Sequence, residues 1–314
     1  MTAHNAGWPR VDGANFLETT ASLQLWTQIV GKIRLALNPM INHWWQVPLY
    51  VSARGLATSP MPVSGGRLLD IEFDFIDHRL VSRSSDGGVD SIQLNECALS
   101  GFYSRVMASL GKLGIAVAIN PVSVEMPEAV HMDRDPRACH YDAEWVRRFF
   151  AALVRIDVVL KRFRGGFEGK ASPVHFFWGG FDLAVTRFSG RAAPPHPGGI
   201  PHVADAVMRE AYSHEVSSAG FWPGDARFPE AAFYSYAYPE PAGFKDAAVR
   251  PAAARYDKTL GEFVLPYEAV RAAPDPEADL LAFLETTYTA AADLARWDRR
   301  ALERPPQGQA GQPS

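Results

Sequence analysis

The sequence predicts an α+β fold built from two pseudo-symmetric halves, each with a mostly antiparallel sheet flanked by helices in the order helix, strands, helix. Apolar residues recur at helical spacing in four long segments, and short runs of alternating apolar and polar residues lie between them. One order of elements describes residues 15–113 and again residues 142–297. Helices that cover one face of an antiparallel sheet are the arrangement that this pattern favours.

The first half opens with a helix over residues 15–37, which Pro39 ends. A strand over 43–54 follows, and Pro48 places it at a sheet edge or at a bulge. Strict alternation of apolar and acidic residues over 69–75 predicts a half-buried strand. The other predicted elements of this half are strands over 80–83, 89–94 and 115–124 and a helix over 99–113.

The second half opens with a helix over residues 142–164, for which Asp142 is the expected N-cap. A strand with several charged residues is predicted over 172–191, and a proline-rich loop over 192–203 follows it. The later elements are strands over 212–222, 232–238 and 262–270 and a helix over 277–297.

These elements divide the chain into an N-terminal half over residues 1–126, a linker over 127–141 and a C-terminal half over 142–303. The alternative is that both halves form one integrated domain. Residues 304–314 are rich in proline, glutamine and glycine, which predicts a disordered tail.

The two halves can be aligned as an internal repeat. The alignment pairs His43-Trp44-Trp45 with His175-Phe176-Phe177, and one extra residue in the Gly179-Gly180 pair brings Arg54 onto Arg187. Similar orders of helices and strands also arise by chance in α+β chains, so the repeat is a hypothesis. If it holds, a cleft between the halves is an expected place for a ligand.

Composition argues against several classes of protein. The chain has 314 residues and a net charge of −4, which does not match the basic surface of a nucleic-acid-binding protein. It has no apolar run of about 18 residues and no secretory leader, so no membrane partner is predicted. Cys97 and Cys139 form no CxxC motif, which favours two free thiols in a cytoplasmic protein.

No metal site is predicted. One local cluster holds potential ligands, but their spacing matches no known metal motif: His131, Asp133, Asp135, Cys139 and His140. Phosphate-binding loops and the HExxH motif are absent from the sequence. The sequence therefore specifies no cofactor, and it does not define an oligomeric state.

Charged residues in the run over 172–191 are the first candidates for a site. Asp182 and Arg187 lie among apolar residues, where charged side chains are rarely buried without partners. A buried carboxyl has a raised pKa unless a cation is near, and Arg54, Arg187 or Arg191 could supply that cation. An internal salt bridge between the halves is the structural alternative. Period-2 alternation places Asp182 and Trp178 on one strand face and Arg187 on the other.

Histidines and tyrosines supply further candidates. His175 and His214 could act as general bases near neutral pH. A core or surface histidine is the alternative for His214. Tyr236 belongs to a tyrosine stripe with Tyr234 and Tyr238, which lies either at the edge of the core or along a polar-tipped cavity.

Several motifs together resemble a bacterial family, the domain-of-unknown-function family numbered 5996, from about Trp8 to Glu303. The resemblance implies one complete protein rather than a fusion, and it implies no catalytic residue, substrate or cofactor. The motifs that carry it are Trp26 to Lys32, Asn42 to Trp45, Asp74 to Arg79, Ser172 to Gly179, Asp182 to Arg191 and Tyr212 to Glu215.

Two hypotheses of function follow. The first is a small-molecule-binding protein or enzyme with a cleft between the halves and general acid–base or hydrolytic chemistry; it predicts that the candidate side chains converge on one pocket. Its catalytic residues would be His175, Asp182 and His214, and its ligand-binding residues His43, Trp45, Arg54, Trp178, Arg187 and Tyr236. The second is a non-enzymatic structural or interaction protein with an aromatic-rich core, which predicts a contiguous exposed apolar patch.

Overall fold

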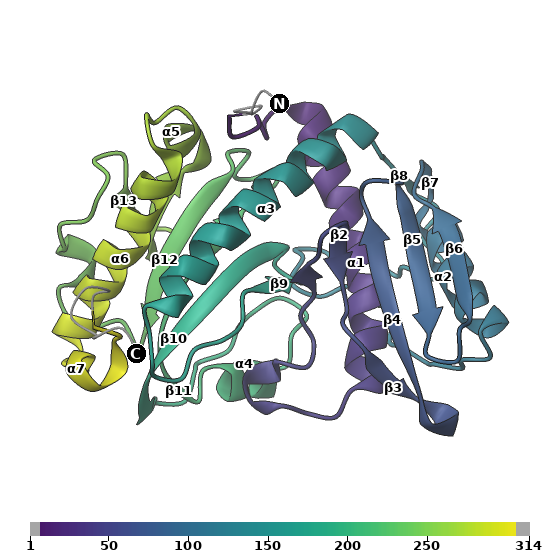
Figure 1. Cartoon of the computed structure of the whole chain (residues 1–314), viewed down its shortest axis with the longest axis horizontal. Coiled ribbons are helices and arrows are strands. Elements are labelled where there is room, and N and C mark those ends of the chain that lie inside the picture. The colour runs from purple at the N-terminus through teal and green to yellow at the C-terminus, as the bar shows by residue number, and fades with distance from the viewer. Residues whose placement is uncertain (1–6, 306–314) are drawn as a thin grey trace, which may run out of the picture.

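The computed structural model describes residues 7–305 and confirms the α+β class (Figure 1). Two six-stranded antiparallel sheets and one two-stranded sheet form the β layers. The helices are α1 (Ala14–Leu37), α2 (Leu99–Lys112), α3 (Ala143–Gly165), α4 (Asp205–Ala211), α5 (Tyr267–Arg271), α6 (Pro276–Leu294) and α7 (Arg299–Leu302). In the described part of the chain, no helix combines the length and the apolar character needed to cross a membrane.

The first sheet has the strand order β1-β2-β4-β5-β6, and β3 pairs with the start of β4. Its apolar side chains Leu69, Ile71 and Phe73 are fully buried, as the alternation along this strand predicts. The strands are β1 (Tyr50–Val51), β2 (Gly55–Ala57), β3 (Met61–Val63), β4 (Arg67–Asp74), β5 (Arg79–Ser84) and β6 (Val89–Gln93).

The second sheet has the order β13-β14-β12-β11-β10-β9, and α3 and α6 pack on one of its faces. Asp142 caps α3 by accepting hydrogen bonds from the amides of Glu144 and Trp145, as predicted. The strands are β9 (His175–Phe177), β10 (Asp182–Ala192), β11 (His214–Trp222), β12 (Ala232–Tyr238), β13 (Arg255–Asp257) and β14 (Glu262–Pro266).

Helix α1 and one backbone bridge join the two sheets. Figure 1 shows α1, in purple, near the middle of the molecule between the two sheets. Leu49 and Phe176 exchange two backbone hydrogen bonds of 2.8 Å, which link the β1 side of the first sheet to the edge strand β9 of the second. Gly31 of α1 leaves the space that the Trp178 ring fills, and the Trp178 indole donates to the Val47 carbonyl over 2.9 Å.

Residues 127–141 pack against the rest of the chain. Val130, Met132 and Cys139 belong to a hydrophobic cluster that also includes buried side chains of both halves. Within this segment β8 (Ala138–Cys139) pairs with β7 (Cys97–Ala98). The division into two halves and the pseudo-symmetry remain predictions. The predicted tail over 304–314 lies, apart from its first two residues, outside the described part of the chain.

Three predicted strands are wrong in extent. Residues 42–44 form a 3₁₀ turn with positive φ at His43 and Trp44, and a strand begins only at Tyr50, after Pro48. Residues 115–124 form only an isolated bridge from Val122 to His131, and at Val124 the Gln28 side chain bonds to both the amide and the carbonyl. The run over 172–191 is a hairpin, in which residues 178–181 form the turn between β9 and β10.

Strand β14 is also shorter than predicted. It ends at Pro266, and α5 begins at the next residue, Tyr267. Proline has no amide hydrogen to continue the ladder and is tolerated at the start of a helix, so Pro266 marks this change of structure.

Candidate functional site

The candidate site lies on the face of the second sheet that α3 and α6 leave uncovered. Alternation along β10 points Asp182, Ala184 and Thr186 toward this face, whereas Leu183 and Arg187 point toward the helices. Two cavities hollow it. The inner cavity, of about 240 Å³, is bounded by β9 to β12, residues 43–47, α4 and Glu125; the outer cavity, of about 590 Å³, is bounded by β12 to β14 and residues 227–230.

Three side chains line both cavities: Asp182, Tyr234 and Tyr236. The Tyr234 hydroxyl donates a hydrogen bond to Oδ2 of Asp182. Tyr236 and Tyr212 share a hydrogen bond of 2.6 Å between their hydroxyls. The shared wall of the two cavities is therefore a carboxylate held among tyrosine hydroxyls.

The Gly179-Gly180 pair explains how a second carboxylate reaches Asp182. A Cβ atom at Gly180 would lie 2.8 Å from Oδ1 of Asp182 and 3.6 Å from Oε2 of Glu125, and a Cβ atom at Gly179 would overlap the Glu125 carboxylate. The two carboxylates thus border the same space beside the β9–β10 turn. A side chain at Gly179 or Gly180 would displace one of them.

Burial raises the pKa of both carboxyls. For Asp182 the pKa rises to about 6, against the opposing effect of the Tyr234 hydrogen bond. For Glu125 it rises to about 7, first because of burial and second because of the charge of Asp182. In the outer cavity, burial and the same charge raise the pKa of Glu262 to about 7. No arginine or lysine of the described residues lines the inner cavity to offset these charges.

The wall opposite the sheet is α4, which residues 43 and 44 hold in place. The His43 amide donates to Oε1 of Glu210 over 3.0 Å, and the Trp44 indole donates to the Val207 carbonyl over 3.1 Å. His43 and Trp44 have positive φ values of 58° and 60°, an uncommon conformation for residues other than glycine that is maintained by surrounding contacts. The strained turn therefore positions one side of the inner cavity.

The His43 ring is neutral, and hydrogen bonds hold both of its nitrogen atoms in place. Its Nδ1 donates to the Ala211 carbonyl over 3.1 Å, so its Nε2 accepts from the Lys170 ammonium over 2.6 Å. Burial, and then the charge of Lys170, lower the pKa of His43. Lys170 lies 5.3 Å from the Trp45 ring, which lines the inner cavity.

The other two candidate histidines, His175 and His214, lie behind the residues that line the inner cavity. His175 is fully buried between Trp45 and Tyr50, and burial, followed by the charges of Arg34 and Arg164, lowers its pKa to about 3. His175 therefore stays neutral at physiological pH. His214 begins β11 with its ring centroid 5.5 Å from that of His43, and it is not among the described residues that line either cavity.

Neither of the two predicted ligand-binding arginines lines the inner or the outer cavity. Arg187 is on the opposite sheet face, where its guanidinium lies 3.4 Å from the Phe163 ring centroid, donates to the Phe163 carbonyl and pairs with Glu285 over 3.5 Å. Arg54 belongs to the first half and pairs with Asp74 over 2.6 Å. Trp178 packs against α1 instead of lining a cavity. The arginine partner expected for Asp182 is thus replaced by the Tyr234 hydroxyl.

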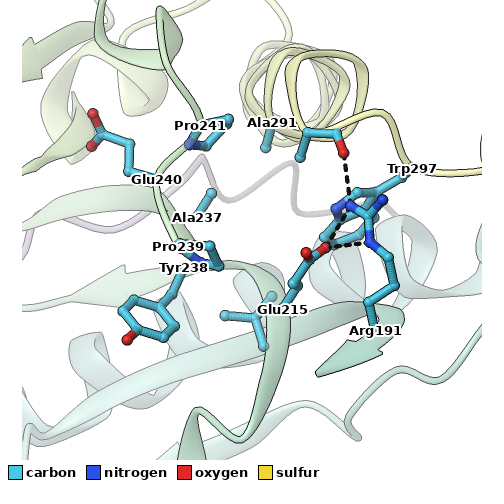
Figure 2. A pocket seen from close by; sticks show the side chains of 11 residues that line it. Arg191, Glu215, Ala237, Tyr238, Pro239, Glu240, Pro241, Ala291 and Trp297 are labelled. Atoms are coloured by element: carbon cyan, nitrogen blue, oxygen red, sulfur yellow. Dashed lines mark hydrogen bonds and ion pairs between the residues drawn. The ribbon is translucent and has the colours of Figure 1, made fainter. Parts of the chain in front are cut away.

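Arg191 lines a separate surface pocket of about 190 Å³ at the end of α6 (Figure 2). It donates to Oε2 of Glu215 over 2.6 Å and to the Ala295 carbonyl over 2.7 Å. Figure 2 shows the pairing of Arg191 with Glu215, and Trp297 lies beside it. Arg191 and Glu215 neutralise each other, and a cation at the C-terminal end of a helix is stabilising. The charged residues of this pocket therefore have a structural role.

The structure brings together four of the predicted site residues, His43, Trp45, Asp182 and Tyr236, and adds residues that the sequence reasoning missed. Glu125 is the main omission. Glu125 follows a segment that resembles a strand but pairs only through an isolated bridge from Val122 to His131. It reaches the site through its own positive φ and the chain crossing at Gln28. The only sequence signal was the Gly179-Gly180 pair. Among the described residues, no group of three or more potential ligands is placed to hold a metal ion.

A pH dependence of stability follows from Glu125. Its pKa rises on folding from an ordinary 4.5 to about 7, so the folded state resists ionisation. Stability is then fully present below about pH 4.5 and is lost as the pH rises toward 7. Relative to Glu125→Gln, we expect the wild type to lose about 1 kcal/mol over this range, reduced by the solvent that reaches the side chain. Urea denaturation at pH 4.5 and 7.5 measures this, with the surface variant Glu18→Gln as control; equal changes in all three proteins contradict it.

The fold is that of an α+β protein in which one face of the second sheet carries two cavities lined by carboxylates and aromatic rings. The chain belongs to a family of unknown function, DUF5996, whose model matches residues 8–304, which confirms the resemblance seen in the sequence. No curated protein and no solved structure matches the chain.

Proposed function

We propose that this protein binds a small organic molecule in the inner cavity, and that Asp182 and Glu125 exchange protons with it. The observation that carries the proposal is the pair of carboxylates that borders one aromatic-walled space beside Gly180. Cavities with mostly apolar walls and a few convergent polar groups are the usual form of small-molecule sites.

The pKa values support acid–base work by this pair. A carboxyl with a pKa of about 6 or 7 can release and take up protons near neutral pH, where an ordinary aspartate stays ionised. The negative charge of Asp182 adds to the rise in the pKa of Glu125, so an ionised Asp182 favours a protonated Glu125. One carboxyl can then act as the acid while the other acts as the base, as in hydrolytic sites built on two carboxylates.

The remaining polar groups have positioning roles in this proposal. Tyr234 holds Asp182 in one orientation, and the hydroxyls of Thr186 and Ser218, 2.9 Å apart, offer further hydrogen bonds on the cavity floor. His175 and His214, the first candidates for a general base, support the wall around Trp45 and His43.

A thermal-shift screen of a metabolite collection tests the proposal. The wild type is compared with Ala184→Phe, which fills the inner cavity from its floor, and with Glu18→Gln as a surface control. Compounds that stabilise the wild type and Glu18→Gln but not Ala184→Phe support the proposal. If Ala184→Phe does not fold, Ala211→Phe fills the cavity from α4. Hits that stabilise the filled variants equally would overturn it.

A role as an interaction protein without a ligand has less support. The large exposed apolar side chains come from many different elements: Leu68 and Val89 of the first sheet, Val154 and Val158 of α3, and Leu294 of α6. Single exposed apolar residues are normal on soluble proteins. The hollowed sheet face, rather than a flat apolar patch, is the feature that calls for a ligand.

A further inference from the structure

Resting on the proposed function, we infer that the ligand is an elongated organic cation with at least two ammonium groups, such as a linear di- or polyamine, that extends from the inner cavity across Asp182 into the outer cavity. Three carboxylates follow this path: Glu125 in the inner cavity, Asp182 at the junction and Glu262 in the outer cavity.

The three carboxylates have no cationic partner among the described residues. The hydrogen bond from Tyr234 to Asp182 involves a neutral donor, and the carboxylates of Glu125 and Glu262 interact with the charge of Asp182, which is of the same sign. Like charges that face one cavity cost free energy unless protons or a ligand neutralise them. A row of such groups is complementary to a ligand with several positive charges.

The other charges around the outer cavity leave it acidic. Glu230 and Asp257 line it in addition to Glu262, whereas its two cations are Arg227 and Arg255. Arg227 pairs with Asp225 over 2.8 Å, and Arg255 is exposed at the edge strand β13. Arg227, Arg255 and Glu230 are therefore exposed at the rim, whereas Asp182 and Glu262 are partly buried in the cavity wall.

Aromatic side chains line the path of the ligand. Trp45 and Phe177 stand in the inner cavity, and Tyr234 and Tyr236, with ring centroids 6.1 Å apart, form the wall that both cavities share. Ammonium groups are attracted to the faces of aromatic rings, and tyrosine hydroxyl oxygens accept hydrogen bonds from them. The protein already places one ammonium in such contact, since Lys170 lies over Trp45.

Titration calorimetry with four probes of the same carbon length tests the inference: 1,4-diaminobutane, butylamine, 1,4-butanediol and succinate, with spermidine as a longer polyamine. At pH 8 we expect the diamine to bind at least tenfold more tightly than butylamine, and spermidine more tightly still. The diol and the dianion should give no measurable heat, because they do not neutralise the carboxylates. At pH 6, binding of the diamine should release protons, seen as a dependence of the heat on the ionisation enthalpy of the buffer.

Three variants locate the charges. Asp182→Asn should weaken both amines by at least tenfold. Glu262→Gln should weaken the diamine and spermidine but leave butylamine unchanged, because the second ammonium contacts the outer cavity. Glu18→Gln should leave every affinity unchanged. Weakening of butylamine and of the diamine by the same factor in Glu262→Gln would overturn the two-site path.

The controls also separate this inference from the proposed function. Tighter binding of the diol or of succinate than of the diamine would overturn the inference, and loss of that binding in Ala184→Phe would leave the proposed function standing. If no amine binds and the metabolite screen yields a neutral or anionic hit that Ala184→Phe abolishes, the inference fails alone. If the amines bind Ala184→Phe as tightly as the wild type, both fail.

Discussion

Replacing Arg187 with alanine should lower the free energy of unfolding by about 3 kcal/mol, because it removes a fully buried side chain and leaves the Phe163 carbonyl without its hydrogen-bond donor. Only 1 % of Arg187 is exposed, and its guanidinium lies against the rings of Phe163 and Tyr288. The variant loses the hydrogen bond to the Phe163 carbonyl and the pairing with Glu285. Urea denaturation of the wild type and the variant measures the loss.

The matched control for this prediction is Glu285→Gln. The Glu285 side chain is 45 % exposed, and glutamine keeps an acceptor for the buried Arg187 guanidinium, so Glu285→Gln should lower the free energy of unfolding by less than Arg187→Ala does. Ligand-induced thermal shifts should persist in Arg187→Ala, since the residue faces α3 and α6 and not the cavities. A variant of unchanged stability that no longer responds to ligand would instead place Arg187 in the binding site.

Replacing Asp182 with asparagine should abolish ligand-induced stabilisation and lower any acid–base turnover by at least about 100-fold. Asparagine keeps an acceptor for the Tyr234 hydroxyl but neither ionises nor carries a proton that it can donate to the ligand. Thermal shifts and initial rates, measured with a compound from the metabolite screen, check the result against Glu18→Gln.

The same substitution should not unfold the protein. The pKa of Asp182 rises on folding from 3.8 to about 6, so its stabilising effect is present below about pH 3.8 and is lost as the pH rises through 6. Asp182→Asn should therefore be as stable as the wild type, or more stable, at pH 8. A variant that is less stable at pH 8 and still binds ligand would show that Asp182 has a structural role.

The helices and strands that could be predicted are those in which buried side chains recur at regular spacing along the sequence. Helix α3, its Asp142 cap and the alternation along β4 all follow from neighbouring residues. The errors arise where a distant group replaces a local partner. Residues 115–124 alternate like a strand, but the Gln28 side chain takes the place of a neighbouring strand at Val124. The apolar residues on both sides of Gly179-Gly180 predict one strand with a bulge at this pair, whereas the structure forms the turn between β9 and β10 there.

The candidate site could likewise be predicted only where a local sequence period determines which way a side chain points. Period-2 alternation identifies the face of Asp182, and the tyrosine stripe identifies the face of β12 that lines the cavities. Which cation or hydroxyl would meet Asp182 depends on strand order, which places Tyr234 of β12 within reach across β11. The position of Glu125 depends on a chain crossing between elements that lie far apart in the sequence, and no local pattern encodes it.

A crystal structure of the protein with the tightest compound from the ligand screen is the most direct test of the central claim, that the two carboxylates beside Gly180 form a small-molecule site. We predict density in the inner cavity, with ligand atoms within hydrogen-bond distance of the carboxylates of Asp182 and Glu125 and against the Trp45 ring. A ligand bound on another surface, with the inner cavity holding water, would contradict the account.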